Sequence, residues 1–246
     1  MLDPKIFLKL PLNFQNKFYI YPPSMKEVIG NDEFGMYQKI FTLSQEEIED
    51  DFIEKGVDME KIPTPYEYIF ASCYNDKEFL RVFKKAFKFF TKEEITPLFQ
   101  LGIFIVGDLE KKILKAKKID DLVKFEEKDY FNFQNEIRKI IGIPVVEPPN
   151  PNEHPKIRAM KAKARYRDKI KAKQGGGLDL TSMMAAICCM GLGLNPLNIG
   201  DISYASANIL ISQYQNKEKY QLDIDSLLAG ADSKKVKPKY WIQQLE

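Results

Sequence analysis

The segment Asp76–Phe90, DKEFLRVFKKAFKFF, contains the clearest helical pattern in the chain. Its apolar residues recur at steps of three and four, which places them along one side of a helix, and four cations occupy the other side. This spacing predicts a helix that packs its aromatic side chains into a core and leaves its basic side in solvent. An aromatic surface that binds a partner is the alternative interpretation.

Four Ser or Thr residues on either side of this helix are each followed, three positions later, by glutamate. In such a capping box the hydroxyl accepts a hydrogen bond from a first-turn amide, and the carboxylate accepts one from the amide of the capping residue. The pattern predicts helix starts near residues 25, 45 and 65 and a shorter turn near residue 92. The four pairs are Ser24 with Glu27, Ser44 with Glu47, Thr64 with Glu67, and Thr91 with Glu94.

Short runs of β-forming residues predict strands in the same half of the chain. Ile6–Leu8 and Phe18–Tyr21, with a turn-rich stretch between them, predict a β-hairpin. Ile95–Phe99 and Ile103–Val106 predict two further strands, with glycines in the turns that follow them.

A last helix is predicted over Asp129–Ile141, which is amphipathic and is followed by Gly142, a residue type that commonly ends helices. Together with the strands, this indicates a mixed α+β N-terminal domain over residues 1–147. The chain as a whole is then α+β, because the remaining residues predict helices.

A proline-rich stretch, EPPNPNEHP over residues 147–155, predicts a domain boundary, since proline resists both helix and sheet. Lys156–Lys173 follows with nine cations and one acid, a net charge of +8; the whole chain is only +2, so the other residues sum to −6. Good helix formers fill this basic segment. We therefore assign residues 148–177 to a linker with a basic helix, and residues 178–246 to a helical C-terminal domain.

The basic segment has three interpretations that its composition leaves open. It could neutralise several phosphates of a nucleic acid, although no base-reading motif accompanies it. It could dock on an acidic protein partner. It could also be an inert, solvated linker.

The C-terminal half predicts three short helices. The first runs from Asp179 or Thr181 to Met190, and the second runs from Asp201 or Ser203 to about Asn216. The third is a stripe over Tyr220–Leu228. We expect Trp241 to pack back on these helices with its two neighbours. Met183, Met184 and Met190 are adaptable gap-fillers that favour core packing, and methionines also suit promiscuous binding grooves.

Residues that could carry catalysis are sparse. The one histidine, His154, lies in the proline-rich stretch, which excludes a conventional Ser-His-Asp triad and argues against zinc. Carboxylate pairs such as Asp50-Asp51 lie in charged stretches that we expect to be exposed. The cysteines Cys73, Cys188 and Cys189 show no CxxC spacing, so we expect reduced, mostly buried thiols. We therefore predict a non-enzymatic protein without metal or cofactor, and no run of residues predicts a membrane span.

Four stretches resemble proteins encoded among the tail genes of phages and prophages of Gram-positive bacteria. They are YIYPPSMKEVIG (Tyr19–Gly30), DYFNFQNEIRKIIGIP (Asp129–Pro144), NEHPKIRAMKAKARYRDKIKAK (Asn152–Lys173) and SLLAGADSKKVKPKYWIQQLE (Ser226–Glu246). The resemblance covers most of the chain. It implies a tail assembly chaperone that binds the long tape-measure protein in the bacterial host cytoplasm.

This resemblance carries over no catalytic residue. Two alternatives stay open: a minor structural component retained in the virion, and a nucleic-acid-binding accessory protein acting through the basic segment. Other tail proteins and further copies of the chain are also candidate partners. The residues predicted to bind a partner are Lys156, Arg158, Lys161, Lys163, Arg165, Tyr166, Arg167, Met183 and Met184.

Overall fold

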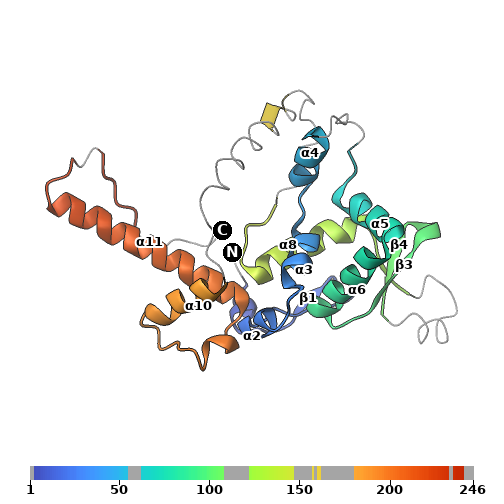
Figure 1. The fold of residues 1–246 in the computed structure, drawn as a ribbon, viewed down its shortest axis with the longest axis horizontal. Helices are drawn as coiled ribbons and strands as arrows, with labels where there is room; N and C mark the ends of the chain where they lie inside the picture. Colours follow the sequence, from blue (N-terminus) through green and yellow to red (C-terminus); the bar gives the residue numbers. More distant parts are fainter. Residues whose placement is uncertain are drawn as a thin grey trace.

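The computed structural model describes residues 3–54, 62–107, 122–146, 157, 160–161, 180–232 and 235–240. Its fold is α+β, as the sequence predicted, with helices around one two-stranded and one three-stranded sheet (Figure 1). The elements of the first half are α1 (Pro4–Phe7), β1 (Leu12–Phe14), β2 (Phe18–Ile20), α2 (Met25–Ile29), α3 (Phe34–Thr42), α4 (Gln45–Glu54), α5 (Pro65–Asn75) and α6 (Lys77–Thr91). They are followed by β3 (Ile95–Leu98), η2 (Phe99–Leu101), β4 (Ile103–Val106), β5 (Val123–Phe125), α8 (Glu127–Ile141), α10 (Leu180–Cys189), η4 (Ile199–Asp201) and α11 (Tyr204–Leu228).

Helix α6 lies at the centre of an aromatic core, which confirms the core interpretation of its stripe. Asp76 caps the helix by accepting from the backbone amides of Glu78 and Phe79. The fully buried rings of the core come from α3, α6, α8 and the strands, and they include Phe41, Phe83, Phe87, Phe90, Phe104, Phe125 and Phe133. Most neighbouring rings meet edge to face or tilted, the arrangements that aromatic pairs prefer.

The first hairpin differs from its prediction. Residues 4–7 form helix α1, because Asp3 accepts from the amide of Lys5 and Pro4 occupies the first helical position. The partner of β2 is instead β1, with Leu12 opposite Ile20. The predicted strand over Ile6–Leu8 is therefore wrong: a local cap overrides the β-forming composition of those residues.

Three of the four capping boxes are confirmed by reciprocal hydrogen bonds, at Ser24, Ser44 and Thr64. The fourth is wrong, because Thr91 is the last residue of α6 and its hydroxyl donates to the carbonyl oxygen of Phe87 at 2.7 Å. The chain turns there at Lys92, whose φ is 62°, and then enters β3. Helix α3 was not predicted, since no side chain caps its start.

The three-stranded sheet has the order β3-β4-β5 with antiparallel pairing. Strands β3 and β4 confirm the prediction, and β5 was not predicted. Immediately after β5, Asp129 in the first turn of α8 accepts from the ammonium group of Lys17 at 2.6 Å. Lys17 also donates to the carbonyl oxygen of Lys124 at 3.0 Å, so the first hairpin is held against the start of α8. Gly142 ends α8 at φ 75°, as expected.

Glu33, just before α3, joins this helix to α6 through charges. Arg81 and Lys85 donate to its two carboxylate oxygens at 2.9 and 3.0 Å, and Tyr37 donates at 2.8 Å. The hydrogen bond from Arg81 is the largest of the effects that lower the pKa of Glu33 to about 2. Burial, followed by the neighbouring Glu33, raises the pKa of Tyr37 to about 12.

We expect the Glu33→Gln variant to show a weaker dependence of stability on pH. A carboxyl whose folded pKa is depressed from 4.5 to about 2 stabilises the fold above pH 4.5 and loses that contribution as pH falls toward 2. Urea unfolding of both proteins across this window measures the effect. The stability difference between them should shrink as pH falls, and a difference that is constant with pH would contradict the prediction.

Within the described residues, the C-terminal part contains two α-helices, α10 and α11, where three were predicted. Residues 204–228 form the single 25-residue helix α11, capped by Ser203, because no glycine or proline separates the second and third predicted helices. Figure 1 shows the far half of α11 extending away from the rest of the molecule. In the tail, Tyr240 packs its ring on Tyr220 with centroids 5.9 Å apart, whereas Trp241 lies outside the described residues.

The C-terminal helices pack directly on the N-terminal part. Met25 of α2 is fully buried in a small cluster with Ile187, Ile199, Ala207 and Ile211. Backbone hydrogen bonds join the same regions: the amide of Met25 donates to Ile202 at 2.9 Å, and the amide of Tyr204 donates to Pro23 at 2.9 Å. The proposed division at residues 147 and 178 stays a prediction.

Candidate partner-binding surface

The segment Leu180–Gly200 contains no acidic or basic residue, in a chain that is 29% charged. We call it the uncharged segment. It comprises α10 and the loop that returns to η4. A surface built from such a segment can bury itself against an apolar partner without desolvating a charge, which is the costly step in binding.

Met183 and Met184, the methionines predicted as contact residues, lie on this segment together with Met190. Met183, Met184 and Met190 pack against the small cluster around Ile187, yet each keeps part of its surface exposed. In α10, only Ile187 is buried. These side chains therefore pack against the small cluster on one side and remain accessible to a partner on the other.

The loop after α10 exposes two leucines. Leu192 is 53% exposed and Leu197 is 95% exposed. Two asparagines order the loop: the amide of Asn195 donates to Oδ1 of Asn198 at 2.7 Å, and Asn198 Nδ2 donates to the carbonyl oxygen of Gly193 at 3.1 Å. The amide of Leu197 donates to Oδ1 of Asn195 at 2.9 Å.

These leucines were missed by the sequence reasoning. The available signal was the pair of asparagines three residues apart, because Asx side chains commonly order turns through their own backbone. A single exposed leucine is ordinary. Two on an ordered loop that directly follows the half-exposed methionines in the chain form, with them, the candidate partner-binding surface.

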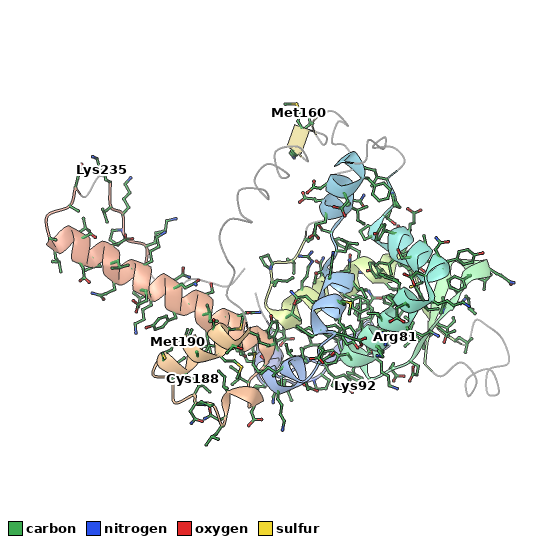
Figure 2. All side chains as sticks on the ribbon, in the orientation of Figure 1. Arg81, Lys92, Met160, Cys188, Met190 and Lys235 are labelled. Atoms are coloured by element: carbon green, nitrogen blue, oxygen red, sulfur yellow. The ribbon has the colours of Figure 1, made fainter. Side chains whose placement is uncertain are left out.

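The basic segment contributes little that can be placed. Lys161 is helical and exposed. Met160, its neighbour in the chain, lies well apart from Cys188 and Met190 in Figure 2, so Lys161 is not brought next to the methionines of α10. The other six predicted residues lie outside the described residues: Lys156, Arg158, Lys163, Arg165, Tyr166 and Arg167.

Titratable groups in the described residues do not gather into a reactive site. Cys73 is buried, and burial raises the pKa of its thiol to about 12. Cys188 is half-buried and Cys189 is exposed, so the expectation of mostly buried thiols fails for Cys189. Asp50 is buried rather than exposed as expected, because it lies on a turn of α4 in which Ile48 and Glu49 are buried as well. The same residues contain no group of three or more potential metal ligands.

The prediction that the protein is not an enzyme stays a prediction. Among the helices in the described ranges, none has the length and apolar character needed to cross a membrane.

A family model described as the YomV second domain matches residues 169–246, and that family is associated with phages. This part of the chain resembles a phage protein domain. No curated protein and no solved structure matches the chain. The matched residues contain the whole uncharged segment and α11, whereas Met25, which completes the small cluster, lies outside the match.

Proposed function

We propose that this protein is a non-enzymatic phage tail assembly protein that acts as a chaperone of the tape-measure protein. The observation that carries the proposal is the uncharged segment, with two exposed leucines and three half-exposed methionines. The phage-associated family model over residues 169–246 supports the phage context. The tail-gene resemblance of the sequence supports the specific role.

Such a chaperone must bind many segments of its partner, and it must bind each of them weakly. A long helical chain that awaits assembly exposes apolar stripes, and its chaperone must cover them and later release them. Burying one leucine contributes about 1.5–3 kcal/mol, whereas association costs about 4–15 kcal/mol. One such surface therefore binds weakly, which suits release when tail-tube subunits displace it.

Methionine side chains fit the same requirement. They are unbranched and polarisable, so they adapt to apolar surfaces of different shape. A chaperone that covers many segments of one long chain needs this tolerance more than it needs specificity. The basic segment would add attraction to acidic stretches of the same partner.

The test is a nuclease-treated pull-down of the tagged protein from cells that express the neighbouring tail genes, analysed by mass spectrometry. We expect recovery of one very long helical protein, and absence of the chaperone from finished virions. Its presence in purified virions would favour the structural alternative. Recovery of no partner protein after nuclease treatment, with nucleic acid recovered when the treatment is omitted, would favour the nucleic-acid alternative.

Combined replacement of Leu192 and Leu197 by serine should reduce recovery of the long partner by about tenfold or more, since two buried leucines are lost from the interface. Thermal stability should change little, because both side chains are exposed in the free protein. Leu101→Ser is the matched control, since Leu101 is 55% exposed on η2, outside the uncharged segment. Equal recovery with the double variant and the control would reject this surface.

A further inference from the structure

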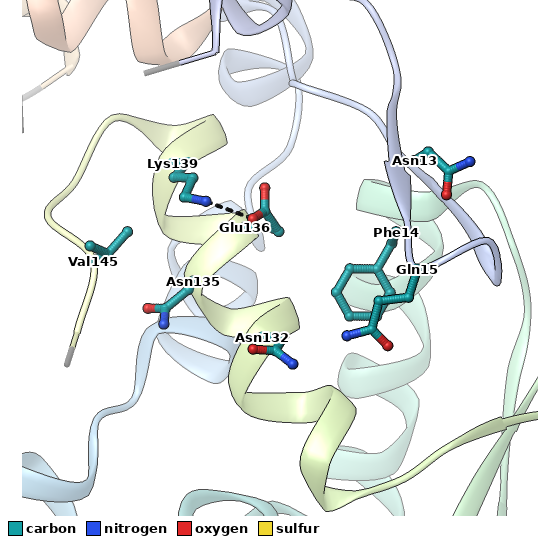
Figure 3. Close-up of a pocket in the computed structure, with 8 residues that line it drawn as sticks. All are labelled: Asn13, Phe14, Gln15, Asn132, Asn135, Glu136, Lys139 and Val145. Atoms are coloured by element: carbon teal, nitrogen blue, oxygen red, sulfur yellow. Dashed lines mark hydrogen bonds and ion pairs between the residues drawn. The ribbon is translucent and has the colours of Figure 1, made fainter. Parts of the chain in front are cut away.

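A shallow trough of about 510 Å³ crosses α8, and none of its lining residues belongs to the uncharged segment. Its floor consists of residues spaced by three and four along one side of α8: Asn132, Asn135, Glu136 and Lys139. Figure 3 shows Val145 on one side of the helix and the tip of the first hairpin, Asn13, Phe14 and Gln15, on the other.

The lining is neutral and polar. Lys139 forms an ion pair with Glu136 at 2.7 Å, so the two charges on the floor cancel and give an ionic ligand no net attraction. Phe14 is 3% exposed and offers no open ring face on which a sugar could stack. What remains are side-chain carboxamides, each of which combines a donor and an acceptor. A ligand matched to them presents neutral donors and acceptors in alternation.

A polypeptide backbone presents donors and acceptors in this way, and α8 already binds a stretch of the chain's own backbone. The side chain of Asn135 accepts from the amide of Val146 at 3.0 Å and donates to the carbonyl oxygen of the same residue at 3.1 Å. Arg138 Nη1 donates to the carbonyl oxygen of Pro144 at 3.1 Å. The wall of the trough is thus an extended segment of the chain, held by a two-point carboxamide contact.

Two further carboxamides are available for the same contact. Asn132 Nδ2 donates to the carbonyl oxygen of Lys128 at 3.1 Å, which leaves its Oδ1 able to accept. Gln15, on the opposite wall, is exposed, and its side chain has no hydrogen bond within the part of the chain that the structure describes. Strand β1 pairs with β2 alone among the described strands, so its other edge carries unpaired backbone groups.

We propose that this trough binds an extended, uncharged segment of a partner polypeptide through its backbone. The segment lies between the hairpin tip and residues 143–146. Asn132 and Gln15 hold its amide groups as Asn135 holds Val146. Recognition is therefore by backbone and not by side-chain sequence, as in strand addition to a sheet edge.

The probe is a library of random short peptides, displayed and selected on the immobilised full-length protein, with affinities of the synthesised peptides measured by calorimetry. The double variant Asn132→Ala, Gln15→Gly removes both carboxamides. Alanine suits a helix, and glycine suits the positive φ of 51° at Gln15, so the fold should be kept. Gln221→Ala, which removes an exposed carboxamide from α11, is the matched control.

We expect selected peptides to bind the double variant about tenfold more weakly than the control, since two hydrogen bonds are lost. N-methylation of every second peptide amide should weaken binding, whereas alanine replacement of peptide side chains should not. Selected peptides should bind the Leu192→Ser, Leu197→Ser variant normally. Failure of the trough proposal can therefore be distinguished from failure of the proposed function. Equal binding by the double variant and the control, or sensitivity to peptide side chains at helical spacing, would overturn the proposal.

Discussion

Replacing Phe133 by alanine is expected to destabilise the protein by about 3–5 kcal/mol, which is a large part of the stability of a typical domain. Phe133 is fully buried in α8, and its ring centroid lies 5.1–5.9 Å from those of Phe14, Phe18, Phe41, Phe87 and Phe125. The first hairpin, α3, α6 and β5 meet on this one side chain. Its removal leaves a cavity that the surrounding rigid rings cannot close, and cavities carry their own cost. Equilibrium unfolding in urea measures the loss.

The control for this prediction is Phe99→Ala. Phe99 also packs against aromatic rings, those of Phe70 and Tyr74, but it is 37% exposed on η2. Because water can fill the space that its ring leaves, we expect a loss well below that of Phe133→Ala. Equal losses in the two variants would show that the aromatic core around Phe133 does not carry the stability assigned to it.

Replacing Gly142 by alanine is expected to cost about 2–4 kcal/mol, from backbone strain and overpacking together. Gly142 has a φ of 75°, and a Cβ there would lie 3.1 Å from the backbone Cα and carbonyl oxygen of Ala205 and from Cβ of Asn208. Asn208 also donates to the carbonyl oxygen of Ile141 at 2.7 Å. A methyl group at Gly142 would therefore push α11 away from the end of α8.

Gly102→Ala separates the two costs. Gly102 has a similar φ of 66°, but a Cβ there would meet no atom within 4 Å. It should therefore show only the strain of a left-handed alanine, about 1–2 kcal/mol. Hydrogen exchange of the first turns of α11 should rise in Gly142→Ala and stay unchanged in Gly102→Ala. Similar stability and exchange in the two variants would contradict the close approach of α8 and α11.

The features that the sequence predicted correctly depend on interactions between residues that are close together in the chain. The capping boxes at Ser24, Ser44 and Thr64, the stripe of α6 and the end of α8 at Gly142 were all predicted. Each depends on residues within about one helical turn of one another, so the sequence contains both partners side by side. The uncharged character of Leu180–Gly200 is likewise a property of the sequence alone.

The tertiary structure alone decided the features that join distant residues. Strand β5 exists because β4 offers it a partner, and helix α3 lacks a capping signal and depends on packing against α6 and α8. The same holds for the candidate sites. Leu197 is 95% exposed, whereas Ile199, two residues later, is buried in the cluster with Met25. The trough forms where the first hairpin meets α8. A chain fixes its local hydrogen bonds by its own spacing, but burial depends on which distant segments exclude water from a side chain.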